Sequence, residues 1–330
     1  MPGLMYTASA GFEAARRIRT ASDMRRCLHG HSFLLNARWA ENLGTLSPEH
    51  VRQAVAPLDY ADLNQALAVP DDATLLTQLA DALPGHAGLW LRSAPDRGVL
   101  CSPHGGPLLH WLQVSFEAAH RLPNVPAGHQ CGRLHGHGFG VTLCARNTHA
   151  ELEQAWQGLH PQLHQRLLND IPGLANPTSE VLSHWLWQQL ANQLALDHVI
   201  VRETATAGSQ FNGQDYRIWK TQRFEAATPF DAQGCYTGHS YSLRLHLAGT
   251  LDQVMGWVLD FGDVKTRFKP FYQQLDHHPL DQVAGLADFS CAGIARWAAE
   301  QLQADTPELT RVDVYQRPGE GALYECDGEG

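Results

Sequence analysis

Three histidines and one cysteine, His120, Cys131, His135 and His137, lie within a stretch of 18 residues. His135 and His137 are two residues apart, and on a β-strand this spacing points both imidazole rings to the same face. His120 on a neighbouring strand would complete a set of three nitrogen ligands. Three protein ligands that leave one position open are typical of catalytic zinc, whereas structural zinc sites are closed by four. The sequence therefore predicts a zinc site that polarises substrate oxygens.

The pattern around these residues occurs three times in the chain of 330 residues. Each copy begins with Phe-Glu-Ala-Ala, at Phe12, Phe116 and Phe224, and continues with a cysteine followed by a Gly-His pair. In the second copy we expect strands at 112–122 and 135–146, helices at about 150–168 and 179–194, and strands at 198–204 and 215–221 around a turn at 212–213. The N-cap of the second helix is expected at Thr178 or Ser179. The chain is therefore predicted to contain three fused ββααββ-like units, at 1–107, 108–219 and 220–330.

The composition excludes several classes of protein. The formal charge is −10 and no run of basic residues stands out, which disfavours binding to nucleic acid. No apolar run approaches the length of a membrane span, and no signal peptide is apparent. The seven cysteines are scattered without a CxxC pair, as expected for reduced thiols in a cytoplasmic protein.

The second unit resembles the family of 6-carboxytetrahydropterin synthase and 6-pyruvoyl-tetrahydropterin synthase, which have the tunnelling fold. The matching strings are FEAAHRLP at 116–123, GHQCGRLHGH at 128–137, NDIPGLANPTSE at 169–180 and VRETATAG at 201–208. They are closer to the carboxy-forming enzyme of the queuosine (deazaguanine) pathway than to the pyruvoyl-forming one. The resemblance implies an α+β fold in which three tandem units form one pseudo-trimeric antiparallel β-barrel with the helices outside. It also implies that two such barrels stack, so that the chain would be a homodimer.

The resemblance assigns roles to residues of the second unit. His120, His135 and His137 would bind Zn²⁺, and the thiolate of Cys131 would act as a base. Glu203 would anchor the pterin ring, because a carboxylate accepts two hydrogen bonds from an aminopyrimidine edge. The helix start at Thr178 and Ser179 would contribute to substrate binding, and Arg121 and Arg133 are candidates for binding the triphosphate.

The family also requires an Asp-His pair, which the second unit lacks at 163–166. The third unit has this pair at Asp276 and His277. In the family the cysteine and the Asp-His pair come from different subunits, so we expect Cys131 of the second unit to work with Asp276 and His277 of the third. The alternative interpretation of Asp276 and His277 is an ordinary pair at the end of a helix.

The other two copies of the site have lost key residues. Arg16 replaces the first histidine ligand in the first unit, and arginine does not deprotonate to bind zinc. Tyr60 stands there in place of the relay histidine and Ser93 near the position of the glutamate, while His29 and His31 remain as a relic or a second metal site. The third unit has Thr228 and Thr237 at two ligand positions and Gln316 near that of the glutamate. We therefore expect one composite active site per chain.

The expected reaction converts 7,8-dihydroneopterin triphosphate to 6-carboxy-5,6,7,8-tetrahydropterin, acetaldehyde and triphosphate. A close alternative is the pyruvoyl-forming reaction, which stops before the carbon–carbon bond is cleaved. A second alternative is a non-catalytic protein that binds a pterin or a purine. Such a protein would have no need for the thiol of Cys131.

Overall fold

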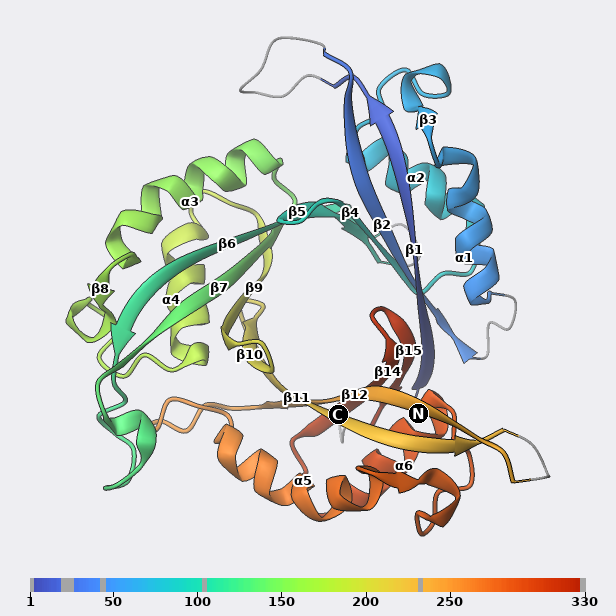
Figure 1. Cartoon of the computed structure of the whole chain (residues 1–330). Helices are drawn as coiled ribbons and strands as arrows, with labels where there is room; N and C mark the ends of the chain where they lie inside the picture. The colour runs from blue at the N-terminus through green and yellow to red at the C-terminus, as the bar shows by residue number, and fades with distance from the viewer. Residues whose placement is uncertain (1–2, 19–26, 42–45, 103–105, 231–233, 327–330) are drawn as a thin grey trace.

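The computed structural model describes residues 3–18, 27–41, 46–102, 106–230 and 234–326. Within these ranges the chain repeats one order of elements three times, with two long strands, two helices and a shorter hairpin in each copy (Figure 1). The first copy contains β1 (Gly3–Arg16), β2 (His29–Ala40), α1 (Pro48–Val55), α2 (Asp72–Ala82), β4 (Gly88–Ala94) and β5 (Arg97–Cys101). The second contains β6 (Leu109–His120), β7 (His135–Ala145), α3 (His149–Leu163), α4 (Ser179–Leu190), β9 (Leu196–Thr204) and β10 (Ala207–Phe211). The third contains β11 (Tyr216–Pro229), β12 (Tyr236–Gly249), α5 (Phe261–Leu275), α6 (Cys291–Leu302), β14 (Leu309–Arg317) and β15 (Glu320–Glu325).

Twelve of the described strands form one closed antiparallel barrel. The hydrogen-bonded order runs β10-β9-β7-β6-β5-β4-β2-β1-β15-β14-β12-β11, and pairing of β10 with β11 closes the ring. Each copy joins the next by such a pairing, so no long strand of the barrel is left with an open edge. The predicted α+β barrel of three tandem units is confirmed.

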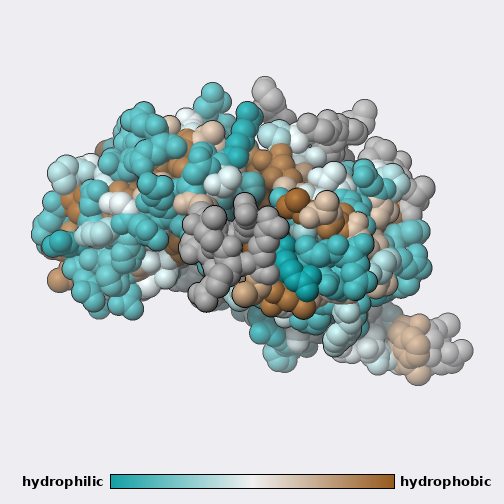
Figure 2. All heavy atoms as spheres, turned by 90° about the horizontal axis from the view of Figure 1, so that it is seen from above, coloured by the Kyte–Doolittle hydropathy of each residue, from teal (hydrophilic) through white to brown (hydrophobic). Residues whose placement is uncertain are grey.

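Six helices cover the outside of the barrel (Figure 1). Alternate strand residues point to these helices, and they form three separate cores, one for each copy. In the second copy, Phe116 and Phe139 of the strands pack with Trp156 and Leu186 of α3 and α4. Seen from above, the outer surface is mostly hydrophilic, with hydrophobic atoms in scattered patches (Figure 2). Among the described helices, none combines the length and the apolar character needed to cross a lipid bilayer.

A strained residue repeats with the fold. Tyr60, Gln165 and His277 have φ angles of 54°, 58° and 61°, the only positive values among the described non-glycine residues. Each follows the first helix of its copy and donates its backbone N–H to the carbonyl oxygen of a glutamate on the first strand: Glu13, Glu117 and Glu225. The short strands β3 (Ala61–Asp62), β8 (Arg166–Leu167) and β13 (His278–Pro279) come next. This turn explains why the helix predicted at 150–168 ends already at Leu163.

The last hairpin of the second copy also differs from the prediction. Its turn lies between Thr204 and Ala207, and the strand β10 after it had not been predicted. The predicted turn at 212–213 exists, but it joins β10 to β11, the first strand of the third copy. Since β11 is one continuous strand from Tyr216, the predicted division between 219 and 220 falls inside it. The repeating order of elements divides the copies at 212–215 instead.

Candidate active site

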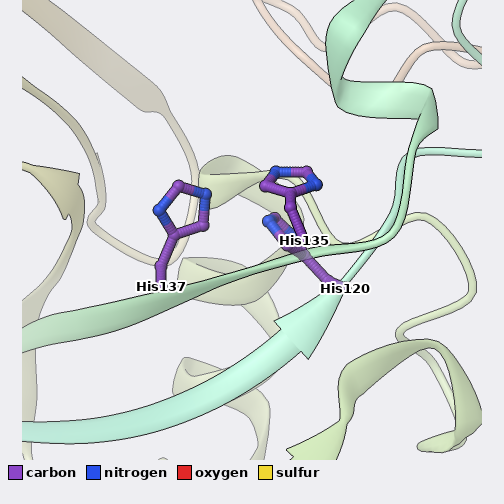
Figure 3. Close-up of side chains that lie close together, drawn as sticks. All are labelled: His120, His135 and His137. Atoms are coloured by element: carbon purple, nitrogen blue, oxygen red, sulfur yellow. The ribbon is translucent and has the colours of Figure 1, made fainter.

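His120, His135 and His137 come together at the end of the β6–β7 hairpin (Figure 3). His120 is the last residue of β6 and lies opposite His135, the first residue of β7. The strand alternation then places His137 on the same face as His135. Each residue offers a ligand atom, and these atoms all lie within 4.8 Å of one another. Among the described residues this is the one group of His, Cys, Asp and Glu side chains that meets this condition.

The hydrogen bonds of these histidines suit a metal ligand. The Nδ1–H group of His120 faces the carbonyl oxygen of Pro177 at 3.1 Å, and that of His135 faces the carbonyl oxygen of Arg133 at 2.7 Å. Such bonds leave Nε2 as the free lone-pair donor, which is the usual outer-shell arrangement of metal-binding histidines. The Nε2 atom of His120 is buried without a partner among the described residues. Burial also lowers the pKa of His120 to about 4, so the ring is neutral and able to bind a metal at neutral pH.

A cavity of about 630 Å³ opens in front of the three histidines. It lies between the second and third copies, because its walls combine β7, α4 and β9 with the segment that leads into α5. The residues of the third copy are held there by hydrogen bonds from the second: Asn124 to the carbonyl of Val254, and Asn176 to that of Met255, both at 2.6 Å. Side chains that could do chemistry line the cavity: Cys131, Arg133, Glu203, Lys220, Trp257 and Asp260.

Cys131 lies on a short 3₁₀ turn of the cavity wall that is tied to the third copy. His129 accepts a hydrogen bond from the backbone N–H of Cys131 at 3.2 Å, and its Nε2 atom lies 3.3 Å from Oδ2 of Asp260. The other carboxylate oxygen of Asp260 caps the N-terminus of α5, at 2.6 Å from the backbone nitrogen of Gly262. Burial, together with the charges of Glu203 and Asp260, raises the pKa of the Cys131 thiol. A cation at the three histidines would act in the opposite direction and favour the thiolate.

Two neighbouring carboxyl groups line the cavity. Glu203, near the end of β9, makes no hydrogen bond to any described residue, and burial together with the neighbouring Glu180 raises its pKa to about 8. Glu180, in the first turn of α4, is 2% exposed and accepts a hydrogen bond from the backbone N–H of Val258 at 3.1 Å. Burial raises its pKa to about 7. Glu203 is therefore the carboxyl group that remains free to bind a ligand.

Thr178 and Ser179 line the same cavity, but their hydroxyl groups already have partners. Thr178 caps α4 by accepting from the backbone N–H of Val181, and it donates to the carbonyl of Gly256. Ser179 donates to Glu180 at 3.0 Å. These contacts position α4 against the third copy, so a role in substrate binding would use backbone groups or require these bonds to change.

The structure does not bring Asp276 and His277 to Cys131 within one chain. They follow α5, whereas the cavity is lined by residues that begin this helix of 15 residues. His277 lies 3.1 Å from Asp276 and is 76% exposed, in a separate shallow groove with Glu225 and His239. The expected partnership is therefore not formed inside the chain. The acid that reaches the Cys131 loop is Asp260, at the opposite end of α5.

In the first copy, a buried ion pair stands where the second copy has its three histidines. Arg16 stands where His120 stands in the second copy, is 2% exposed, and binds the carboxylate of Asp72 at 2.7 Å. Ser93, near the position of Glu203, donates a hydrogen bond to the same carboxylate. His31 bonds to the carbonyl of Ser93 at 2.8 Å. A buried ion pair with its own hydrogen bonds thus occupies the place of the metal site and the glutamate.

Several cavity residues carried no assigned role in the sequence analysis, namely His129, Glu180, Lys220, Trp257 and Asp260. His129 and Glu180 lie within strings that were singled out, two residues before Cys131 and one after Ser179. Asp260 stands directly before α5, and an aspartate in that position is an N-cap pattern that the sequence carries. Its contact with His129 spans 131 positions, and only the closed barrel brings the two together.

Comparison with known proteins identifies the family of this chain. The model of the family described as 6-pyruvoyl tetrahydropterin synthase matches residues 111–214 and 217–327, which together exceed half of the chain. A 6-carboxy-5,6,7,8-tetrahydropterin synthase from Synechocystis sp. is 32% identical over 118 residues, which cover 31% of this chain and 90% of that protein. The 6-pyruvoyl tetrahydropterin synthase of Caenorhabditis elegans is similar at 18% identity and a TM-score of 0.31, covering 34% of this chain and 95% of that one. The Plasmodium vivax enzyme gives 18% identity and a TM-score of 0.29, with coverages of 34% and 99%.

Proposed function

Since the chain belongs to the 6-pyruvoyl tetrahydropterin synthase family of enzymes, we propose that it converts 7,8-dihydroneopterin triphosphate to 6-carboxy-5,6,7,8-tetrahydropterin, acetaldehyde and triphosphate in the deazaguanine pathway. One water molecule is consumed when the carbon–carbon bond of the side chain is cleaved. The observation that carries this proposal is the convergence of three metal-competent histidines, a free thiol and a free carboxyl group on one cavity. The carboxy-forming relative supports this product over the pyruvoyl one.

The three histidines would hold Zn²⁺, because neutral imidazoles with an open fourth position are the ligands of catalytic zinc. Bound there, Zn²⁺ would act as a Lewis acid that makes the hydroxyl groups of the substrate side chain more acidic. Glu203, ionised when a ligand donates to it, would accept two hydrogen bonds from the amino group and ring N–H of the pterin. Cys131 would take up and return the protons that move along the side chain. Arg133 and Lys220 supply the positive charge that the triphosphate requires.

Incubation of the zinc-loaded protein with 7,8-dihydroneopterin triphosphate, followed by mass spectrometry of the pterin, tests the proposal. We expect carboxytetrahydropterin and acetaldehyde, and we expect Cys131→Ala to abolish both. Cys101→Ala is the matched control, since Cys101 lies on β5 in the first copy. A pyruvoyl product would show that the protein catalyses the alternative, pyruvoyl-forming reaction. Unchanged substrate with zinc bound would favour a protein that binds pterins without turnover.

We further propose that the Asp276–His277 pair serves the Cys131 cavity of a second chain. His277 is exposed at the rim of its own copy, and its pairing with Asp276 already orients the imidazole. In a twofold dimer each second copy would face the third copy of the partner, so that two equivalent sites form. Neither chain alone would contain a complete site.

Subunit complementation tests this dimer. Cys131→Ala and His277→Ala chains should each be inactive. A mixed dimer would keep one intact site, formed by Cys131 of one chain and the partner's His277, so equimolar mixing should restore about a quarter of the wild-type activity. No recovery in mixtures shown to exchange subunits would refute the shared site. Full activity of the His277→Ala chain alone would show that His277 takes no part in the reaction.

A further inference from the structure

The inner face of the barrel carries arginines that lie away from the active-site cavity. Strand residues that do not point to the helices point into the lumen, and on β2, β9 and β12 these include Arg38, Arg202 and Arg244. Their neighbours Leu35, Val201 and Leu243 face the helical cores, which fixes the direction of the alternation. The lumen thus concentrates positive charge in a chain whose net charge is −10.

The three guanidinium groups are held by neutral partners. Arg38 lies over the ring of Trp90 at 4.2 Å, and Arg202 and Arg244 each lie 5.9 Å from the ring of Trp219. Arg202 donates to the hydroxyl of Thr142 at 3.1 Å, and Arg244 donates to that of Thr221 at 3.0 Å. Among the described residues, none of the three forms an ion pair with a carboxylate. Aromatic rings and hydroxyl groups fix their geometry but do not neutralise their charge.

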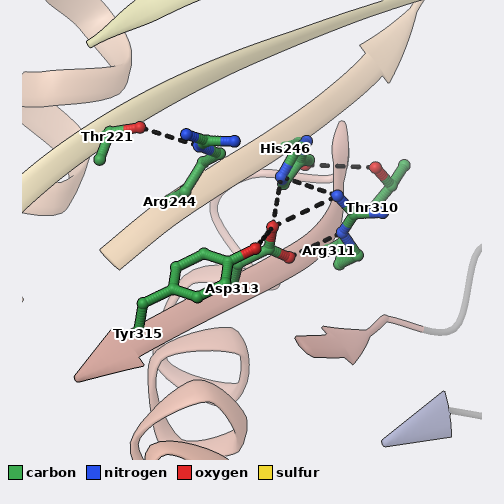
Figure 4. A network of polar contacts seen from close by, with 7 residues as sticks. All are labelled: Thr221, Arg244, His246, Thr310, Arg311, Asp313 and Tyr315. Atoms are coloured by element: carbon green, nitrogen blue, oxygen red, sulfur yellow. Dashed lines mark hydrogen bonds and ion pairs between the residues drawn. The ribbon is translucent and has the colours of Figure 1, made fainter. Parts of the chain in front are cut away.

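The lumenal carboxylate of Asp313 already has several partners of its own. Asp313 is buried and binds Arg311 at 2.7 Å and 3.3 Å, His246 at 2.9 Å and the hydroxyl of Tyr315 at 3.1 Å (Figure 4). Figure 4 shows Arg244 beside this network, bonded to Thr221 and not to Asp313. Among the described residues, Arg244 and Arg38 therefore form no ion pair with Asp313, whose charge acts on Arg38 only from beyond ion-pair distance.

A lumenal cavity of about 620 Å³ lies at these arginines. Arg38 and Arg244 line it together with Thr7, Asn36, Ser242 and Tyr315, and it shares no lining residue with the cavity at the three histidines. The Nε atom of Arg38 is buried without a partner among the described residues. Burial and the nearby charges of Arg311 and Arg244 lower the pKa of Arg38, although the charge of Asp313 acts in the opposite direction. Burying a charge in this way is costly unless a counter-ion arrives.

We propose that the lumen binds a small multiply charged anion of the phosphate or polyphosphate class, held by Arg38 and Arg244 with further attraction from Arg202. Guanidinium groups match phosphate oxygens through two parallel hydrogen bonds, and the hydroxyl and amide groups of the cavity supply further donors. This site does not depend on the proposed reaction at the histidines.

Calorimetric titration of the full chain with inorganic triphosphate and with inorganic phosphate, at constant ionic strength in chloride, tests the site. We expect saturable binding that Arg38→Gln and Arg244→Gln each weaken at least tenfold. Arg52→Gln is the control with the same change of charge, because Arg52 lies on the surface in an ion pair with Glu49. The Arg133→Gln/Lys220→Gln double variant removes anion contacts of the other cavity and should keep the lumenal binding.

Three results would overturn the proposal. The first is the absence of saturable binding, and the second is unchanged binding in both folded lumenal variants, as judged by circular dichroism. The third is loss of binding in the Arg133→Gln/Lys220→Gln variant alone, which would assign the anion to the histidine cavity.

Discussion

Replacing Glu203 by glutamine should make the protein more stable at neutral and alkaline pH while removing its affinity for a pterin. The pKa of Glu203 is raised to about 8 by burial and by Glu180, whereas the unfolded chain ionises near the ordinary value of 4.5. Between these two pH values the folded protein holds a proton that the unfolded protein has lost. The contribution of Glu203 to stability therefore falls as pH rises through this window.

The size of the effect follows from the same two values. The difference of about 3.5 pH units corresponds to about 4–5 kcal/mol of stability lost by the time Glu203 is ionised in the folded state. Glutamine does not ionise, and it also relieves Glu180 of a neighbouring negative charge. The free energy of unfolding of Glu203→Gln relative to wild type should thus be near zero at pH 5 and rise by about 3–5 kcal/mol by pH 8.5.

Urea unfolding at a series of pH values measures this difference directly. Histidine titrations are common to both proteins and cancel in the comparison. Glu300→Gln, at an exposed position of α6, is the control and should show a flat difference. A difference for Glu203→Gln that stays constant with pH, or that falls as pH rises, would refute the reasoning. If Glu203→Gln loses pterin binding but its difference in free energy of unfolding does not change with pH, Glu203 contacts the ligand but its pKa is not raised in the folded protein.

Three further predictions concern the metal site, the thiol and the converted first site. Metal analysis of His120→Ala should find only a small fraction of the roughly one zinc ion per chain expected in the wild type. In calorimetry, a chelator should lower the melting temperature of the wild type but not that of this variant. Asp260→Asn should lower the pKa of Cys131, measured as thiolate absorbance with Cys131→Ala as the blank; an unchanged or raised pKa would argue against their coupling. Arg16→Met should cost about 3–5 kcal/mol by leaving Asp72 buried without its cation, whereas Arg17→Met, at an exposed pair, should cost under about 1 kcal/mol in the same urea assay.

The repeat and the metal site could be predicted from the sequence because both depend on local periodicity. Phe12, Phe116 and Phe224 mark the same strand three times, and the spacing of His135 and His137 fixes their common face. The ends of helices were harder to predict, because glutamine is not a residue type that favours the left-handed backbone found at Gln165. Likewise, Ala207–Phe211 is short and begins with small residues, so it has little strand character of its own.

The composite part of the site could not be derived from the sequence. The Cys131 loop meets Asp260 through His129, because the second copy docks on the loop before α5, a contact between copies that local patterns do not encode. The resemblance named an Asp-His pair across a boundary between subunits. In a fused chain two kinds of boundary exist, between copies and between chains, and the sequence does not distinguish them. Within the chain His277 is exposed and lies in a groove separate from the Cys131 cavity, so the proposed partnership requires a boundary between chains.

The pairing of β1 with β15 has a consequence for how the chain is made. Gly3 lies opposite Glu325, so the first and the last described strands are neighbours in the finished ring. During synthesis this edge of β1 stays available for wrong partners until β15 has been made, because β15 follows all the other strands of the ring in the sequence. The ring also has no intrinsic beginning. A permuted chain in which β15 is linked to β1 and which is cut instead at 212–215, between β10 and β11, would give every strand the same neighbours but a different last strand to close the ring.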